Sequence, residues 1–279
     1  MPEYLLYNGS FYKSDKPLIA ADNRGLRYGD GLFETMKVKD KKIYFSTWHC
    51  ERLFHGMQML GFEPPAYFSP EYLLGQVNEL CRKNGHSNAR VRINIVRGNG
   101  GLYDPENHFP NCIIQSSPLP GSNYQFNETG LVTGIYNDAK KSVDSFSNLK
   151  SNNYLPYLMA ALHAKKQRWN DALLLNSAGN ICDATIANIF IVKNGIVLTS
   201  PLTDGCIAGI MRRHLVENLP VQGFALQEKT ISIQDLLAAD EVFLTNSIRG
   251  IQWVQNCDAA NYSCKLGSVV YDKLLKSMD

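Results

Sequence analysis

The chain has 279 residues, enough for one large domain or two ordinary ones, and its 44% hydrophobic and 19% charged residues are typical of a globular protein. A net charge of +2 without a Lys/Arg-rich block argues against a nucleic-acid partner, and the apolar runs are too short to span a membrane. The N-terminal stretch MPEYLLYNGSFYKSDK lacks a signal-peptide core, and the seven cysteines form no CxxC pair, so we expect reduced thiols in the cytoplasm and no metal site.

The first half of the chain alternates short strands with two helices. Alternating apolar positions, turn signals and helical spacing predict strands at 4–12 (around an Asn-Gly turn), 41–46, 89–101 and 111–119, helices at 49–62 and 70–85, and a glycine-rich turn leading into a strand at 24–40. Residues 116–125, SSPLPGSNYQ, are small, polar and twice interrupted by proline, which favours a linker.

The second half mixes the same two periodicities. It predicts strands at 131–136, 171–176, 188–200 (with an Asn-Gly turn) and 241–247, and helices at 152–169 and 209–219. Mixed strands and helices on either side of a linker predict an α+β protein with domains 1–115 and 126–279, joined by residues 116–125. The interface between two domains is a common place for a cofactor pocket.

Lys150 stands at the head of an apolar, helix-like run, NLKSNNYLPYLMAALHAKK. The partial positive charge of a helix N-terminus makes a cation in the first turn mildly unfavourable. Helix formation therefore does not explain a lysine at this position, which makes a functional role worth considering. A lysine amine whose pKa is lowered is a nucleophile towards aldehydes, whereas the ordinary alternative is a solvated side chain.

Three further features of the second half could carry chemistry. Asp183 comes just before a predicted strand in NICDATIANIFIV, AGIMRR at 208–213 is a glycine-led helix start, and LTNS at 244–247 ends a strand with polar groups. The free amides of a helix start form a ready anion site. Each feature also has an ordinary explanation. Asp183 could be a turn or cap residue, the glycine of AGIMRR could simply mark the start of a helix, and LTNS could be a common strand end.

Taken in order, RGLRYGDGLFET, HCERL, LKSNN, CDATIANIF, GIMR and LTNS resemble the class IV (fold type IV) pyridoxal-phosphate enzymes, over roughly residues 4–255. This family includes branched-chain aminotransferases, D-amino-acid aminotransferases and aminodeoxychorismate lyases. The resemblance implies a small N-terminal α/β domain, a larger C-terminal domain with a β-barrel-like sheet core, and pyridoxal 5'-phosphate (PLP) at the domain interface. It also implies a homodimer that acts on a small, amino-acid-like substrate.

The resemblance assigns roles to individual residues. Lys150 would hold the cofactor aldehyde as a Schiff base and shuttle the substrate's α-proton. Asp183, where the family normally has glutamate, would keep the ring nitrogen protonated. The remaining cofactor-binding positions, most of them facing the phosphate, are Arg52, Asn188, Gly209, Ile210, Met211, Asn246 and Ser247.

Several positions favour the lyase within this family. GIMR replaces the GIT of aminotransferases, and Thr35 in FET matches a threonine that the lyase uses next to the lysine. Asn153, three residues after Lys150, fits lyases and D-amino-acid aminotransferases, because branched-chain enzymes place it one residue later. Leu102 and Asp104 stand where D-amino-acid aminotransferases carry an arginine and a histidine that clamp the substrate carboxylate. The lyase pattern also often has an arginine near this glycine pair, and Leu102 departs from that pattern as well.

The cation that binds a substrate carboxylate must therefore come from elsewhere. Arg92 and Arg97 share one predicted strand, whose alternation puts them on opposite faces, so one of them should face the site. Arg27, beside Tyr28 in the glycine-rich turn, is a further choice, and an ordinary surface arginine is the alternative for each.

Three functional hypotheses remain open. The first is 4-amino-4-deoxychorismate lyase, which forms 4-aminobenzoate and pyruvate in folate synthesis. The second is a transaminase that uses D-amino acids or other amino acids with a 2-oxo acid acceptor. The third is a non-catalytic relative, which Asp183 and Met211 keep open as departures from the family pattern and which Lys150 opposes.

Overall fold

The computed structural model describes residues 4–121 and 124–278, and the chain divides into two compact units. Unit 1 comprises Met1–Ser122 with Leu149–Asn153, and unit 2 comprises Asn123–Asn148 with Tyr154–Asp279. The segment expected to be a linker, 116–125, begins inside the last strand of unit 1, which ends at Pro118, and its residues 122 and 123 lie outside the described part. Nothing in the sequence indicated that Leu149–Asn153 returns to unit 1.

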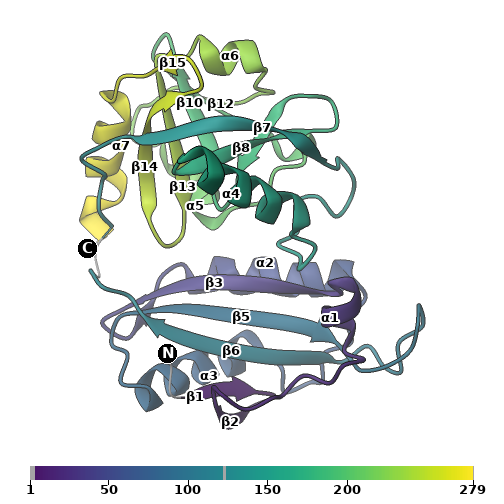
Figure 1. The fold of residues 1–279 in the computed structure, drawn as a ribbon. Coiled ribbons are helices and arrows are strands. Elements are labelled where there is room, and N and C mark those ends of the chain that lie inside the picture. The colour runs from purple at the N-terminus through teal and green to yellow at the C-terminus, as the bar shows by residue number, and fades with distance from the viewer. Residues whose placement is uncertain (1–3, 122–123, 279) are drawn as a thin grey trace. The chain divides into compact units, whose positions relative to one another are not determined.

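Unit 1 is built on a six-stranded antiparallel sheet in the order β2-β1-β6-β5-β3-β4. Its strands are β1 (Tyr4–Tyr7), β2 (Ser10–Lys13), β3 (Gly31–Lys39), β4 (Lys42–Ile43), β5 (Ala89–Arg97) and β6 (Pro110–Pro118), and Figure 1 shows β3, β5 and β6 side by side. Asn8 and Gly9 join β1 to β2 with φ of 48° and 79°, the left-handed pair that a tight hairpin turn requires. The predicted Asn-Gly hairpin is confirmed.

Two long helices, α2 (Ser46–Met59) and α3 (Pro70–Lys83), bury their apolar faces with the sheet in one core. In α3, Ser69 caps the first turn by accepting from the Tyr72 amide (3.2 Å), and Leu73 and Val77 are fully buried, as the helical spacing predicted. The start of segment 24–40, expected to be only a turn, forms the short helix α1 (Arg24–Tyr28) before β3 begins.

The expected helical position of Lys150 is wrong. The helix that follows it, α4 (Leu155–Gln167), begins five residues later, with Pro156 in its first turn. Residues 150–152 instead extend the sheet of unit 1 beside β3: the Phe33 amide donates to the Lys150 carbonyl, and the Asn152 amide donates to the Gly31 carbonyl, each over 2.9 Å. These backbone bonds hold Lys150 in an extended segment, where the helix-dipole argument does not apply.

Unit 2 contains a mixed nine-stranded sheet in the order β12-β11-β10-β13-β14-β7-β8-β9, with β15 paired to β14. Its strands are β7 (Leu131–Lys141), β8 (Asp171–Asn176), β9 (Ile181–Ala184), β10 (Asn188–Lys193), β11 (Ile196–Thr199), β12 (Leu226–Glu228), β13 (Glu241–Asn246), β14 (Gly250–Cys257) and β15 (Ala260–Asn261). The sheet curls, so that β9 at its end is bonded to residues flanking β10 and β11: Ala184 N to Ala187 O (2.8 Å), and Ser200 Oγ to Ile181 O (2.7 Å). The predicted barrel-like core is confirmed.

Helix α4 packs against β7 and β8, and α5 (Ile210–Asn218) and α7 (Leu266–Leu274) pack against β13. The short helix α6 (Ile233–Leu237) begins at a reciprocal capping box between Ser232 and Asp235. All seven cysteines are in the described part and carry free thiols, six of them buried. Among the described helices, none is both long and apolar enough to cross a membrane.

Candidate functional site

In unit 1, three of the predicted site residues lie on one face of the sheet, and two of them lie against the ring of Phe33. The Lys150 ammonium lies 4.5 Å from the centroid of this ring, and the Arg92 guanidinium carbon lies 4.0 Å from it. Thr35 is two residues further along β3, which places it on the same sheet face as Phe33, and it is the cross-strand partner of Arg92. An amine, a hydroxyl and a guanidinium therefore share one face of the sheet.

Glu34 points to the opposite face of β3 and is almost fully buried. Its carboxylate accepts from His49 Nδ1 (2.7 Å) and from Arg52 through Nε (2.7 Å) and Nη2 (2.6 Å). Burial alone would raise the pKa of the Glu34 carboxyl, but Arg52 and His49 outweigh it and lower that pKa to about 2. Arg52, which was predicted to bind the phosphate, is thus oriented by a bidentate contact with the Glu34 carboxylate before any ligand binds.

His49 is fully buried, and its Nε2 has no hydrogen-bond partner among the described residues. Burial lowers the pKa of His49, and the charges of Arg52 and Lys150 act in the same direction, against the opposing pull of Glu34. The imidazole is therefore held neutral at physiological pH, within electrostatic reach of the Lys150 amine.

The other predicted arginines are not part of this group. Arg97 is buried and donates from Nε to Asp30 (3.0 Å) and from Nη2 to the Leu60 carbonyl (2.6 Å), so its charge is used inside unit 1. Arg92 and Arg97 lie on opposite faces of β5, as the alternation predicted. Arg27 and Tyr28 are exposed on α1.

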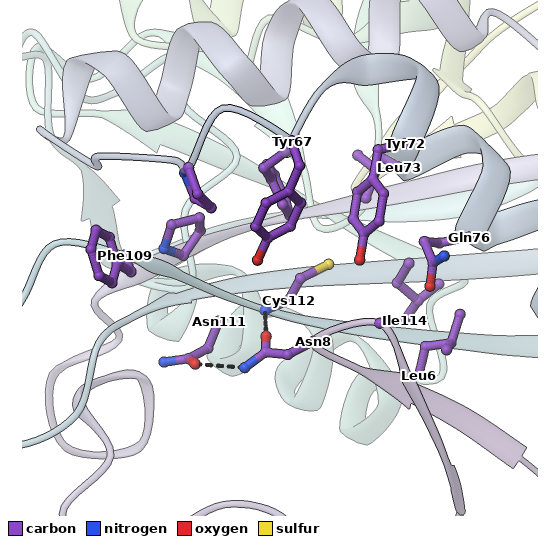
Figure 2. A pocket seen from close by; sticks show the side chains of 14 residues that line it. Leu6, Asn8, Tyr67, Tyr72, Leu73, Gln76, Phe109, Asn111, Cys112 and Ile114 are labelled. Carbon is purple, nitrogen blue, oxygen red and sulfur yellow. Dashed lines mark hydrogen bonds between the residues drawn. The ribbon is translucent and has the colours of Figure 1, made fainter.

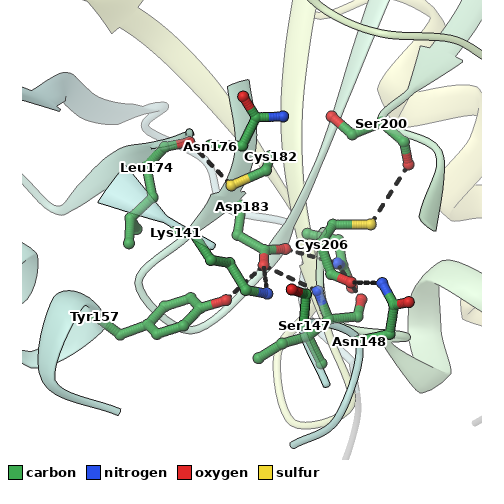
Figure 3. Close-up of polar contacts among 12 residues, drawn as sticks. Lys141, Ser147, Asn148, Tyr157, Leu174, Asn176, Cys182, Asp183, Ser200 and Cys206 are labelled. Atoms are coloured by element: carbon green, nitrogen blue, oxygen red, sulfur yellow. Dashed lines mark hydrogen bonds and ion pairs between the residues drawn. The ribbon is translucent and has the colours of Figure 1, made fainter. Parts of the chain in front are cut away.

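In unit 2, Asp183 is the centre of a buried polar cluster (Figure 3). It lies within β9 rather than just before a strand, because Ile181–Ala184 pairs with β8. Its Oδ2 accepts from Tyr157 (2.7 Å), the Ile207 amide (3.0 Å) and the Lys141 ammonium (3.2 Å), and its Oδ1 accepts from Asn188 Nδ2 (2.9 Å). Burial and the Asp183 charge raise the pKa of the Tyr157 hydroxyl well above its usual value, which keeps this group a donor.

Asn188 connects this acid to the start of α5. Its amide nitrogen also donates to the Ile207 carbonyl (2.8 Å), and a Cβ at Gly209 would lie only 1.8 Å from its Oδ1. Gly209 is the N-cap of α5 and provides no side-chain cap, while Ile210 and Met211 follow in the buried first turn. The amides of this turn have no side-chain cap, and backbone amides at such a helix start can bind an anion.

Asn246 and Ser247 lie at the end of β13, against which α5 packs. Asn246 Oδ1 accepts from the amides of Ile248 (3.0 Å) and Arg249 (2.8 Å), and the Ser247 carbonyl accepts from the Tyr124 hydroxyl (3.0 Å). These contacts shape the turn between β13 and β14, so the structure gives Asn246 a backbone-supporting role at the position predicted to bind the cofactor.

Four residues of these clusters were missed at the level of sequence: Glu34, His49, Lys141 and Tyr157. Glu34 and His49 lie inside the recognised motifs FET and HCERL. An acidic residue in one motif and basic residues in the other were a sequence signal for a buried ion pair. Lys141 and Tyr157 are 42 and 26 positions from Asp183, and no spacing rule links them to it.

A cavity of about 300 Å³ in unit 1 is separate from these clusters (Figure 2). Aromatic, apolar and amide side chains line it, including Tyr67, Tyr72, Gln76 and Asn111, and none of its lining residues is charged. Figure 2 shows the hydroxyls of Tyr67 and Tyr72 directed towards the strand that carries Asn111 and Cys112. None of the predicted site residues lines this cavity.

Comparison with known proteins identifies relatives along nearly the whole chain. The model of the family described as amino-transferase class IV matches residues 31–257. Aminodeoxychorismate lyase of Bacillus subtilis is 27% identical over 285 residues, covering 97% of this chain and 94% of that protein. Branched-chain-amino-acid aminotransferase of Escherichia coli is 23% identical over 265 residues, covering 92% and 85%. The crystal structure of branched-chain aminotransferase from Thermoproteus uzoniensis with norvaline has the same fold, with a TM-score of 0.87, 23% identity and coverage of 97% and 93%.

Proposed function

We propose that this chain, which belongs to the class IV aminotransferase family of PLP-dependent enzymes, is a 4-amino-4-deoxychorismate lyase that releases 4-aminobenzoate and pyruvate for folate synthesis. The observation that carries the proposal is the group around Phe33, where the Lys150 amine, the Thr35 hydroxyl and the Arg92 guanidinium share one face of the unit 1 sheet. The lyase from Bacillus subtilis, which aligns with 97% of the chain, supports it.

The described residues fit PLP on three observations. The first turn of α5 has free amides and no side-chain cap, Gly209 has no room for a side chain, and Asp183 Oδ1 has one protein donor where an oxygen can accept two. PLP, when bound, supplies an aldehyde that condenses with an amine and a protonated ring that withdraws electrons. The α5 amides and the oriented Arg52 guanidinium would hold its phosphate, and Asp183 would accept from its ring nitrogen.

The unit 1 group then provides the acid–base chemistry. The Lys150 amine takes the α-proton of the substrate, and the Thr35 hydroxyl assists this transfer from the same face. Arg92 binds the substrate carboxylate, because Arg97 is already paired inside the unit and Arg92 is the arginine beside Lys150. The buried, neutral His49 adds no further positive charge to the surroundings of Lys150.

A transaminase of D-amino acids or other amino acids is the second candidate. The same lysine and ring acid serve transamination, and an aminotransferase from Escherichia coli aligns with 92% of the chain. One experiment separates the two. The PLP-loaded protein is incubated with aminodeoxychorismate and, separately, with a D-amino acid or branched-chain amino acid plus 2-oxoglutarate. Formation of 4-aminobenzoate and pyruvate supports the lyase, whereas formation of glutamate in the second mixture contradicts it.

Cofactor attachment is tested without turnover. Borohydride should reduce the imine between Lys150 and PLP to an amine, so that the cofactor stays attached to the wild-type protein after denaturation, whereas folded Lys150→Ala treated in the same way should release it. A protein that takes up no PLP would overturn both enzyme hypotheses.

Self-association is also part of the proposal. Opposite its buried face, α4 presents an apolar stripe at helical spacing whose side chains are 42–66% exposed: Leu155, Leu158, Met159 and Leu162. A continuous exposed apolar patch typically marks a contact surface, and an uncharged stripe of this kind complements itself about a twofold axis. We therefore expect a homodimer in which this stripe is covered.

A further inference from the structure

We propose that Lys141 tunes the charge that Asp183 presents to the cofactor's ring nitrogen, so that the strength of the electron sink is set by a buried Lys–Asp pair and not by a lone carboxylate. This inference rests on the role of Asp183 in the proposed function. The pair lies wholly within unit 2: the Lys141 ammonium is 3.2 Å from Asp183 Oδ2, and both side chains are more than nine-tenths buried.

The position of each donor on Asp183 decides what the lysine can do. Oδ2 accepts hydrogen bonds from Lys141, Tyr157 and the Ile207 amide, whereas Oδ1 accepts one from Asn188. Because Oδ2 already accepts three hydrogen bonds and Oδ1 accepts one, Oδ1 is the oxygen with room for a ring N–H. Lys141 therefore shares the carboxylate with the ring and acts on it through Asp183, as a positioning residue rather than a catalytic one.

Charge makes this lysine different from the other donors. Tyr157, Asn188 and the Ile207 amide are neutral, whereas Lys141 brings a full positive charge, which also lies 5.3 Å from the Tyr157 ring. A carboxylate raises the proton affinity of a nearby ring nitrogen, and a cation on the same carboxylate offsets part of that effect. In a buried setting water screens such charges weakly, so the offset is large.

The remaining titratable groups around Asp183 do not cancel this charge. Tyr157 on α4, Cys182 on β9 and Cys206 before α5 face the pair, and burial raises the pKa of each, so all three are neutral. Further out, Arg212 on α5 is paired with Glu228. Of the residues that the structure describes, Lys141 is the one cation within ion-pair distance of Asp183.

The experiment follows the ring nitrogen directly. The holoenzyme is prepared with PLP labelled with ¹⁵N in the ring, and its ¹⁵N chemical shift is recorded against pH for wild type, Lys141→Met and Lys141→Arg. We expect the wild-type nitrogen to titrate within the pH range in which the protein is folded. Lys141→Met should raise the midpoint by about one pH unit or more, a tenfold gain in proton affinity, and Lys141→Arg should restore a value near that of wild type.

If Lys141 only supported the fold, its replacement by methionine would lower stability and leave the titration midpoint of the ring nitrogen unchanged. An unchanged midpoint in PLP-loaded Lys141→Met, or a wild-type nitrogen that stays protonated throughout, would overturn the inference. Lys141→Gln, which keeps a donor without the charge, replaces the methionine variant if that variant does not fold. Asp183→Asn distinguishes failure of the proposed function from failure of this inference. If Asp183→Asn leaves the midpoint unchanged, Asp183 does not have its proposed role. If Asp183→Asn lowers the midpoint but Lys141→Met does not change it, Asp183 keeps its role and the inference about Lys141 is wrong.

Discussion

At the scale of single residues, the carboxylate of Glu34 organises the lysine-bearing unit, because it holds both His49 and Arg52 without access to water. Its pKa is lowered from 4.5 to about 2, so the unfolded chain takes up the proton first as the pH falls. The ionised carboxylate therefore contributes to stability above about pH 4.5 and loses this contribution towards pH 2. A shift of this size corresponds to about 3 kcal/mol.

Glu34→Gln should accordingly lower the free energy of unfolding by about 3 kcal/mol at neutral pH, with a difference from wild type that shrinks as the pH falls from about 4.5 towards 2. Urea unfolding at a series of pH values measures this difference. Glu79→Gln is the matched control, because its exposed pair with Arg82 is worth little. A deficit for Glu34→Gln that is the same at every pH would show that the ionised carboxylate is not its cause.

The two arginines of β5 allow a second prediction at this scale. Arg92→Met should raise the KM for the substrate by about 10- to 100-fold, since a charge-assisted carboxylate contact is worth about 1.5–3 kcal/mol, and should leave the melting temperature nearly unchanged. Arg97→Met should do the reverse, because it leaves the Leu60 carbonyl without its buried donor and Asp30 with Arg24 as its remaining partner. Steady-state kinetics and thermal unfolding of both variants test this contrast, and equal effects on KM would contradict the assignment of Arg92.

At the scale of elements, the N-terminus of α5 depends on a glycine for a steric reason. A methyl group at Gly209 would overlap Asn188 Oδ1, so Gly209→Ala must displace the side chain that links Asp183 to the helix start. We expect a loss of about 1–3 kcal/mol in stability and weaker PLP binding, measured by denaturant unfolding and by cofactor titration.

Gly75→Ala is the control for this substitution. Gly75 lies within α3, and a Cβ there would meet nothing within 4 Å, so the change should stabilise the protein by about 0.5–1 kcal/mol through helix propensity. If Gly209→Ala bound PLP as tightly as wild type, the proposed phosphate contact at the start of α5 would be wrong.

The elements also show how far local sequence patterns reach. Helix α3 and the Asn-Gly hairpins follow from apolar spacing, a serine cap and turn residues, all of which act within a few positions of the chain. Lys150 was misplaced because pairing with Gly31 and Phe33 holds it in an extended segment, and this pairing partner lies more than 110 residues away. The Lys141–Asp183 pair was invisible for the same reason, since burial and tertiary contact create it.

At the scale of the whole molecule, the chain contacts the surroundings of Asp183 just before it enters unit 1 at Leu149. Asn148 donates to the Cys206 carbonyl (2.6 Å) and accepts from the Ala208 amide (3.1 Å), on either side of the Ile207 amide that binds Asp183. These contacts lie within unit 2 and fix the end of the segment that precedes Lys150 to the turn that binds Asp183.

Assembly provides the last prediction. If a second copy covers the apolar stripe of α4, Leu158→Glu places two like charges against each other at the twofold axis and exposes them to an apolar partner surface, both of which oppose association. Sedimentation velocity should then show a dimer for wild type and a monomer for the variant. Val221→Glu is the control, because Val221 is 78% exposed outside this stripe and its replacement should leave the dimer intact. A dimer that survives Leu158→Glu would place the contact on another surface, and a wild-type monomer would refute the dimer itself.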